Sequence, residues 1–163
     1  ASVRTRSSSG GRMSAPAIEG WFTTGPDPTL TGERCTTCTT VYFPPTIAAA
    51  GFCRNPACGG EEFERVPLSR RGRVWSYTDA QYQPPPPYPA PEPFEPFALA
   101  AVELPEGIVV LGQVARGFGV ADLRVGAEAE LVVEPEAVGG ALMWKWLPLG
   151  SGHVTELGEE ADQ

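Results

Sequence analysis

Residues 34–60 read RCTTCTTVYFPPTIAAAGFCRNPACGG, and this stretch decides the N-terminal part of the fold. It holds all four cysteines of the chain, arranged as Cys35-x2-Cys38, a gap of fourteen residues, and Cys53-x4-Cys58. Two close thiolate pairs at this separation are typical of a zinc ribbon, in which each pair lies on a turn and both bind one tetrahedral Zn²⁺. We therefore predict a structural zinc site with these four cysteines as its ligands.

Two other chemistries use the same residues. Two disulfides would require an oxidising compartment, but residues 1–12 are basic and rich in Ser and Gly, and no apolar stretch follows as it would in a secretory signal. We therefore expect a reducing, cytoplasmic location. A redox dithiol at Cys35 and Cys38 would leave the second pair without a role. The longer second pair requires Arg54–Ala57 to bulge outward if both sulfurs are to reach one ion.

The sequence after the cysteines predicts five short strands. The segments alternate apolar and polar residues or are rich in β-formers, and Gly or Pro separates them. They are residues 73–82, 96–104, 108–115, 129–134 and 141–149, with a tight turn at 105–107. Five short antiparallel strands predict a Greek-key barrel of the OB type, although an SH3-like barrel fits almost as well. The predicted fold is mainly β: an N-terminal zinc ribbon followed by a five-stranded OB-fold barrel.

Composition divides the chain into five zones. They are a disordered leader or linker (1–14), a helical or turn segment with an apolar face (15–34), the zinc ribbon (35–65), the OB-fold barrel (66–150) and a flexible acidic tail (151–163). No stretch approaches the roughly 18 consecutive apolar residues that a membrane helix needs, so we expect no membrane partner.

The charge balance bears on the choice of partner. The net charge is −8, and Lys145 is the only lysine. Proteins that bind nucleic-acid backbones use Lys and Arg to displace counterions, so we expect no nucleic-acid partner. An OB-fold module that stacks single-stranded bases on aromatic side chains is the alternative function from a different class.

Several motifs together resemble a known family. They are RCTTCTTVYFPP (34–45), CRNPACGG (53–60), LSRRGRVWSYT (68–78), FALAAVEL (97–104) and DLRVGAEAEL (122–131). In this order they resemble the zinc-ribbon/OB-fold proteins that accompany thiolase-like enzymes acting on acyl-CoA. The resemblance covers residues 18–149. Thr39 stands where the family usually has Gly, and the x4 spacing of the second cysteine pair is a further departure.

The resemblance implies a non-catalytic accessory subunit in a hetero-oligomer with a thiolase-fold enzyme, helping to form its acyl-CoA site. One branch of the family is similar to the C-terminal domain of a steroid enoyl-CoA hydratase, which pairs with an aldolase that cleaves a steroid CoA ester by a retro-aldol reaction. We favour this branch. Accessory proteins of acetoacetyl-CoA thiolase and hydroxymethylglutaryl-CoA synthase are the alternative.

The residues themselves also favour a chain that is not catalytic alone. All four cysteines are assigned to metal, so no thiol nucleophile remains. The single histidine, His153, lies in the polar tail, where a solvated side chain is the simplest interpretation. We predict no catalytic residue.

Two groups of residues are candidate contacts to a partner or to acyl-CoA. The first is the proline-rich segment between the first two barrel strands, with Tyr82, Tyr88, Phe94 and Phe97 as apolar anchors. A stiff connector is its alternative interpretation. The second group is Arg70, Arg71 and Arg73, near Arg65; it suits phosphates or partner carboxylates, or else forms a solvated joint between ribbon and barrel.

Two tryptophans near the C-terminal end of the barrel share one face of a strand. Trp144 and Trp146 are two residues apart, with Lys145 on the opposite face. We expect the tryptophans in the core, and an exposed binding face is the alternative.

Overall fold

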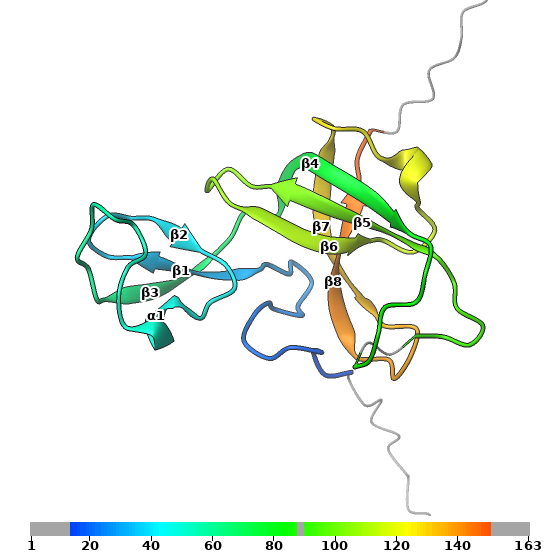
Figure 1. The fold of residues 1–163 in the computed structure, drawn as a ribbon, viewed down its shortest axis with the longest axis horizontal. Helices are drawn as coiled ribbons and strands as arrows, with labels where there is room; N and C mark the ends of the chain where they lie inside the picture. Colours follow the sequence, from blue (N-terminus) through cyan, green and yellow to red (C-terminus); the bar gives the residue numbers. More distant parts are fainter. Residues whose placement is uncertain (1–13, 88–89, 151–163) are drawn as a thin grey trace, which may run out of the picture.

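The structure, a computed structural model, describes residues 14–87 and 90–150 and consists of a small sheet beside a closed barrel (Figure 1). Residues 1–13 of the predicted leader, Tyr88, and the predicted tail with His153 lie outside the described residues. In the part of the chain that the structure describes, no helix combines the length and apolar character needed to cross a bilayer.

The N-terminal sheet is a three-stranded ribbon. Its strands are β1 (Thr31–Cys35), β2 (Val41–Tyr42) and β3 (Phe63–Pro67), ordered β2-β1-β3 with antiparallel neighbours. A four-residue helix, α1 (Ile47–Ala50), follows β2. Glu33 of β1 is buried, and its carboxylate accepts the backbone N–H of Ala48 at 2.8 Å. This hydrogen bond satisfies a buried charge and fixes α1 against the ribbon.

The five barrel strands confirm the strand prediction. They are β4 (Arg71–Ala80), β5 (Phe97–Glu103), β6 (Val109–Val114), β7 (Glu128–Pro135) and β8 (Leu142–Pro148), and their ends differ from the predicted ends by at most two residues. The closed order is β4-β5-β6-β8-β7, with β6 parallel to β8. This order confirms the OB-fold barrel over the SH3-like alternative.

Strict alternation explains why these segments form barrel strands. In β5, Ala98, Ala100 and Val102 are buried, while the residues between them are partly exposed. Successive side chains of a strand point to opposite faces, so one face fills the barrel and the other remains outside. The small alanines leave room inside the barrel for the larger side chains of β8.

The two tryptophans of β8 belong to the core, as expected. Trp146 is fully buried and Trp144 nearly so. Their indole N–H groups donate to the carbonyl oxygens of Val110 and Leu111, both at 3.2 Å. These bonds satisfy the polar end of each buried indole, so the face carrying the tryptophans is not an exposed binding face.

Lys145 lies on the other face of β8 and is nevertheless buried. Its ammonium group donates to the carboxylate of Glu136 at 3.1 Å and to the side chain of Gln113. A buried lysine requires such partners, because transfer of an unpaired charge out of water is costly. The interaction joins β8 to β6 and to the turn that follows β7.

Residues 15–30 form turns and isolated bridges, residues 31–34 belong to β1, and no helix forms within this described stretch. Pro16 pairs with Leu142, and Phe22 pairs with Leu30. The ring of Trp21 packs edge to face on Phe43 of the ribbon and lies tilted against Trp144 of the barrel, at centroid distances of 5.8 and 6.3 Å. Packing against two separate bodies, together with the Gly and Pro residues at 25–28, overrides the helical alternative. The ribbon strands also begin earlier than predicted, at Thr31.

Candidate functional site

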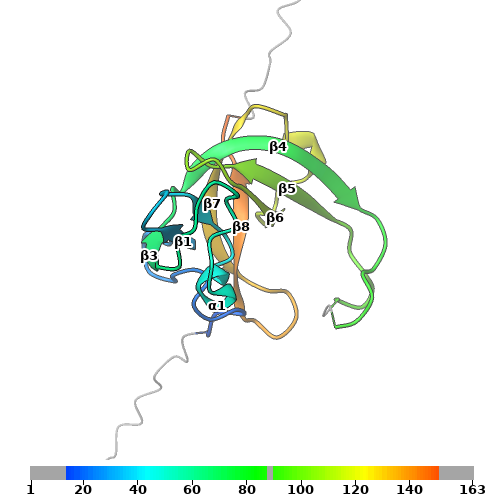
Figure 2. The same cartoon turned by 60° about the vertical axis from the view of Figure 1, so that its left-hand side comes forward.

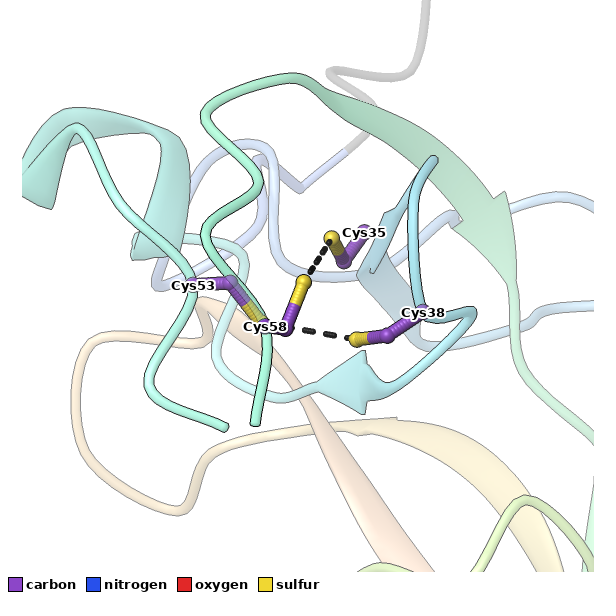
Figure 3. Close-up of side chains that lie close together, drawn as sticks. All are labelled: Cys35, Cys38, Cys53 and Cys58. Carbon is purple, nitrogen blue, oxygen red and sulfur yellow. Dashed lines mark hydrogen bonds between the residues drawn. The ribbon is translucent and has the colours of Figure 1, made fainter. Parts of the chain in front are cut away.

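The four cysteines converge from two loops of the ribbon (Figure 3). Cys35 ends β1 and Cys38 lies in the turn that leads to β2, whereas Cys53 and Cys58 lie on the loop between α1 and β3. Their four sulfur atoms all lie within 4.8 Å of one another. Cys35 and Cys53 are buried and the other two are partly buried, so the cluster is closed on most sides.

The sulfur spacing fits a tetrahedral metal ion. The Sγ atoms of Cys35 and Cys58 are 3.8 Å apart, and those of Cys38 and Cys53 are 3.6 Å apart. A tetrahedron with Zn–S bonds of about 2.3 Å has edges of about 3.8 Å. A disulfide bond is only about 2.05 Å long, and the structure forms none among these four cysteines, so the sulfur spacing favours a metal site over two disulfides.

Ionisation of the cluster also calls for a cation. The Thr40 hydroxyl lies 3.1 Å from Sγ of Cys38, and this hydrogen bond lowers the pKa of the Cys38 thiol to about 6. The Gly60 N–H, 3.3 Å from Sγ of Cys58, acts in the same direction, but burial and the neighbouring thiols raise the pKa of Cys58 to about 12. Four thiolates this close to one another repel, and a metal ion bound among them would offset that repulsion.

A second layer of groups orients the sulfurs. The Tyr42 hydroxyl lies 3.1 Å from Sγ of Cys53, and this contact raises the pKa of Tyr42. Hydrogen bonds of this kind fix ligand orientation and tune metal affinity. Sequence reasoning missed Tyr42, although its position four residues after Cys38, in the FPP motif region, is the signal that points to it.

Both departures from the family pattern have a structural account. Thr39 has a φ of 64°, in the left-handed region where a β-branched residue is strained by about 1–3 kcal/mol, which explains the usual glycine there. In the longer second pair, Asn55 turns the chain: its carbonyl accepts the N–H of Cys58 at 2.9 Å. Arg54, Pro56 and Ala57 are exposed, so the insertion bulges outward as predicted.

Gly60→Ala is expected to weaken metal binding about 10–100-fold, as loss of an outer-layer contact typically does. A Cβ atom at this position would lie 2.8 Å from Sγ of Cys35, closer than real Cβ contacts allow, so the sulfur would have to move. Competition with a coloured zinc chelator measures the change. Gly59→Ala is the matched control, because a Cβ there meets no atom within 4 Å. Equal affinities for the two variants would contradict the prediction.

The proline-rich connection between β4 and β5 forms a long arm that leaves the barrel on the side away from the ribbon (Figure 2). Tyr82 at its start is 77% exposed. Phe94 and Phe97 at its other end pack edge to face, with ring centroids 6.2 Å apart. The arm therefore uses two of its predicted anchors for its own packing and presents the first to solvent; Tyr88 lies outside the described residues.

The predicted arginine group lies between the ribbon and the barrel and has acidic and carbonyl neighbours. Arg70 pairs with Asp27 at 3.1 Å and with Glu130 at 3.8 Å, and Arg71 lies 3.6 Å from the same Glu130. Arg73 donates to the Gly126 carbonyl at 2.9 Å. These partners offset much of the positive charge, so phosphate binding would have to compete with existing contacts.

Two further features of the barrel were not predicted. A pocket of about 250 Å³ lies between the end of the arm and the loop joining β7 to β8, and Lys145 and Gln113 contribute to its lining. Trp75 of β4 is 61% exposed. The sequence pattern places it in a barrel strand but does not say whether its side chain faces the core or the solvent. Only the pairing of β4 with β5 shows that Trp75 lies at a β-bulge.

Comparison with known proteins agrees with this architecture. The family model described as "ChsH2, C-terminal OB-fold domain" matches residues 65–134, from β3 through almost all of β7. A solved structure named "Ltp2-ChsH2(DUF35) aldolase" aligns with a TM-score of 0.56 and 27% sequence identity, over 74% of this chain and 84% of that chain. The likeness therefore includes the greater part of the matched chain.

Two curated relatives have comparable similarity. A "DUF35 domain-containing scaffold protein" of Methanocaldococcus jannaschii is 35% identical over 106 residues, which is 63% of this chain and 66% of that protein. The "Benzoylsuccinyl-CoA thiolase subunit BbsA" of Thauera aromatica is 34% identical over 114 residues, 67% of this chain and 66% of the relative. This chain thus spans slightly less than two thirds of either relative's length. Over residues 65–134, which hold four of the five barrel strands, the chain is similar to the family of ChsH2 C-terminal OB-fold domains.

Proposed function

We propose that this chain is a non-catalytic accessory subunit that binds a thiolase-type enzyme in the cytoplasm and helps to form its acyl-CoA site. The observation that carries the proposal is the match to the chain of the Ltp2-ChsH2(DUF35) aldolase, of which 84% is covered at 27% identity. The resemblance to a benzoylsuccinyl-CoA thiolase subunit supports the same class of partner, since its name also describes one subunit of a thiolase.

The finer proposal is that the partner is a retro-aldolase acting on a steroid CoA ester. Such a reaction breaks the bond between the α-carbon of the thioester and a β-carbon bearing a hydroxyl group. The hydroxyl loses its proton to a base and becomes a ketone, and the α-carbon is protonated to give a shorter acyl-CoA. The partner would supply the base and the stabilisation of the enolate. An acetoacetyl-CoA thiolase or hydroxymethylglutaryl-CoA synthase complex is the second candidate, favoured by the thiolase relative.

Zinc is the metal that the cysteine cluster fits, and its role would be structural. Four protein thiolates fill a tetrahedral shell and leave no position for water or substrate, whereas catalytic zinc keeps one position open. Cys35, Cys38, Cys53 and Cys58 would hold the ion and so fix the ribbon beside the barrel. In this role the chain contributes shape and contacts to the complex, and the partner carries out the chemistry.

The arm and the arginine group are the proposed contacts to the partner or to acyl-CoA. Proline restricts the free arm, so less conformational entropy is lost when a partner orders it. Tyr82, 77% exposed, is the anchor that this arrangement leaves available. Arg71, whose side chain is 62% exposed, is the arginine best placed to exchange its present carboxylate for a phosphate or a partner carboxylate.

Co-purification with a thiolase-like protein from the same organism is the experiment that tests the function. We expect a stable complex that cleaves an acyl-CoA, with neither protein active alone. Assays with a steroid β-hydroxyacyl-CoA and with acetoacetyl-CoA distinguish the two candidate partners. If this chain elutes alone and instead binds single-stranded oligonucleotides in a salt-sensitive manner, the accessory-subunit proposal fails.

Tyr82→Ala is expected to lower the affinity of the complex, or its affinity for acyl-CoA, about 10-fold or more, because interface aromatics carry a large share of binding energy. Titration calorimetry with the purified partner measures the first quantity, and the KM of the complex reports the second. Phe52→Ala, at an exposed ribbon position, is the control. Unchanged values for both quantities would remove the arm from the proposed contacts.

A further inference from the structure

The outer surface of three adjacent barrel strands is apolar and exposed. It consists of Trp75 on β4, Leu99 and Ala101 on β5, and Val109 and Leu111 on β6, and we call it the β4–β6 outer face. Trp75 is 61% exposed, Leu111 58% and Val109 44%. A soluble domain exposes isolated apolar residues routinely, but a contiguous group on one sheet is typical of an interaction site.

Strand register places these residues side by side. Ser76 pairs with Ala101, and Ala101 pairs in turn with Leu111. The neighbouring positions Val102 and Val110 are buried, so Ala101 and Leu111 point out of the barrel. The face is therefore continuous across three strands.

A β-bulge accounts for the position of Trp75. The register of β4 against β5 shifts between Val74 and Ser76, which leaves Trp75 as the extra residue. Bulges redirect a side chain and are frequent next to functional sites. Val74 is buried on the inner side, while the exposed Trp75 precedes Ser76, which pairs with Ala101, so the register neighbours of Trp75 are small. Small neighbours can cover little of a large indole, so most of the apolar surface of Trp75 would be buried only if a second protein covered it.

The rest of the chain packs on a different part of the barrel. Trp21 and Phe22 contact Trp144, and Ala17 donates its N–H to the Leu142 carbonyl at 2.7 Å, so the N-terminal segment covers β8. The high exposure of Trp75 and Leu111 shows that the described residues leave the β4–β6 outer face accessible.

We infer that the β4–β6 outer face is the surface on which the thiolase-type partner docks, an inference that rests on the proposed function. The face has an uncharged apolar centre, and the Arg73–Glu103 pairing at one end and Thr78 and Gln113 at the other give it a polar rim. This is the anatomy of a specific heteromeric interface. A second copy of this chain is a poorer occupant, because each copy carries a net charge of −8 and self-association would bring these charges together.

The test measures binding of the purified thiolase-like protein by calorimetry or surface plasmon resonance. Trp75→Ser and Leu111→Asp are each expected to raise the Kd about 30-fold or more, the effect of losing one interface hot spot. Phe52→Asp is the matched control, since Phe52 is 59% exposed and lies in the ribbon rather than on the barrel, and it is expected to leave the Kd unchanged. Circular dichroism and metal content establish that the variants remain folded, which both exposed positions should allow.

The outcomes separate the inference from the function. If the wild-type chain binds the partner and both face variants bind equally well, or if Phe52→Asp weakens binding as much, the inference is overturned and the proposed function stands. If the wild-type chain binds no thiolase-like protein, the proposed function fails and the inference fails with it. If the wild-type chain is a homodimer and Trp75→Ser dissociates it, the face belongs to a second copy and the inference is overturned. If the wild-type chain binds single-stranded oligonucleotides and Trp75→Ser abolishes that binding, the inference is overturned as well.

Discussion

Cys53→Ser is expected to abolish stoichiometric metal binding and unfold the ribbon. Cys53 is buried, and its sulfur lies 3.6 Å from that of Cys38 across the cluster, so serine would leave three thiolates around the ion. The ribbon is small: its sheet has three strands, of which β2 has two residues. Small modules of this kind depend on their metal, and apparent zinc binding in zinc-finger peptides contributes about 10–16 kcal/mol at pH 7. Loss of one ligand therefore removes more free energy than the ribbon's own packing can replace.

Elemental analysis and hydrogen exchange measure this effect together. We expect one metal equivalent in the wild-type chain and less than about a tenth of that in Cys53→Ser after dialysis against a chelator. Amide protection should disappear in β1–β3 and persist in β4–β8. Phe52→Ser is the control, since Phe52 is adjacent in sequence and 59% exposed. A Cys53→Ser variant that retains one metal equivalent would contradict the assignment, and so would a native mass four hydrogens lower than that of the reduced chain, the signature of two disulfides.

The barrel strands could be predicted because their signal is local. Alternation in FALAAVEL and its neighbours identifies each strand to within two residues. The pairing order is a non-local property, so the pattern favoured the OB barrel only slightly over an SH3-like one. Only the parallel pairing of β6 with β8 distinguishes them. The cysteine cluster was also predictable, because spacing along the chain limits which sulfurs can meet.

The surroundings of several residues could not be predicted, because their partners lie far away in the sequence. Arg70 looked like part of a basic patch, but Asp27 and Glu130, 43 and 60 residues away, lie beside it in the fold. Lys145 was predicted only to lie opposite the tryptophans, and its burial depends on Glu136 and Gln113, which accompany it into the interior. Trp75 looked like an ordinary strand residue, because a bulge is visible only once two strands are paired. In each case the surroundings, rather than the residue type, determine the role.

The ribbon and the barrel share one core, which gives the zinc site a consequence for the barrel. Phe22, Leu30 and Leu68 cluster with Val74, Trp144 and other barrel residues. Phe43 of the ribbon packs edge to face on Trp144, with centroids 5.8 Å apart. Loss of the metal should therefore remove the packing of Phe43 on Trp144 while the barrel strands and the β4–β6 outer face stay in place. If removal of zinc weakens partner binding, the cause would then be a change in the position of the ribbon relative to the barrel.

Gly72→Ala is expected to destabilise the barrel while leaving the metal site intact. Gly72 lies in β4 and pairs with Ala129 of β7, and the next residue, Arg73, pairs with both Glu103 of β5 and Glu128 of β7. The strand thus crosses from one neighbour to the other at this point. A Cβ on Gly72 would lie 2.3 Å from the carbonyl oxygen of Glu103 and 2.7 Å from a methyl carbon of Val102. The first of these atoms belongs to the backbone, so no rotamer change relieves the clash.

Relief requires β4 or β5 to move at the point where the barrel closes. Overpacking a core costs about 1–3 kcal/mol and occasionally more, and a backbone clash belongs at the upper end, near 3 kcal/mol. For a chain of this size about 1 kcal/mol corresponds to roughly 2–4 °C, so Tm should fall by about 6–12 °C. Gly25→Ala is the control, because a Cβ there meets no atom within 4 Å and should change Tm by less than about 2 °C. Calorimetry with parallel metal analysis tests this prediction. A Gly72→Ala protein with the same Tm as the control would show that β4 does not need glycine where it passes Glu103. A lowered Tm with a full metal equivalent would assign the glycine in the LSRRGRVWSYT motif to closure of the barrel.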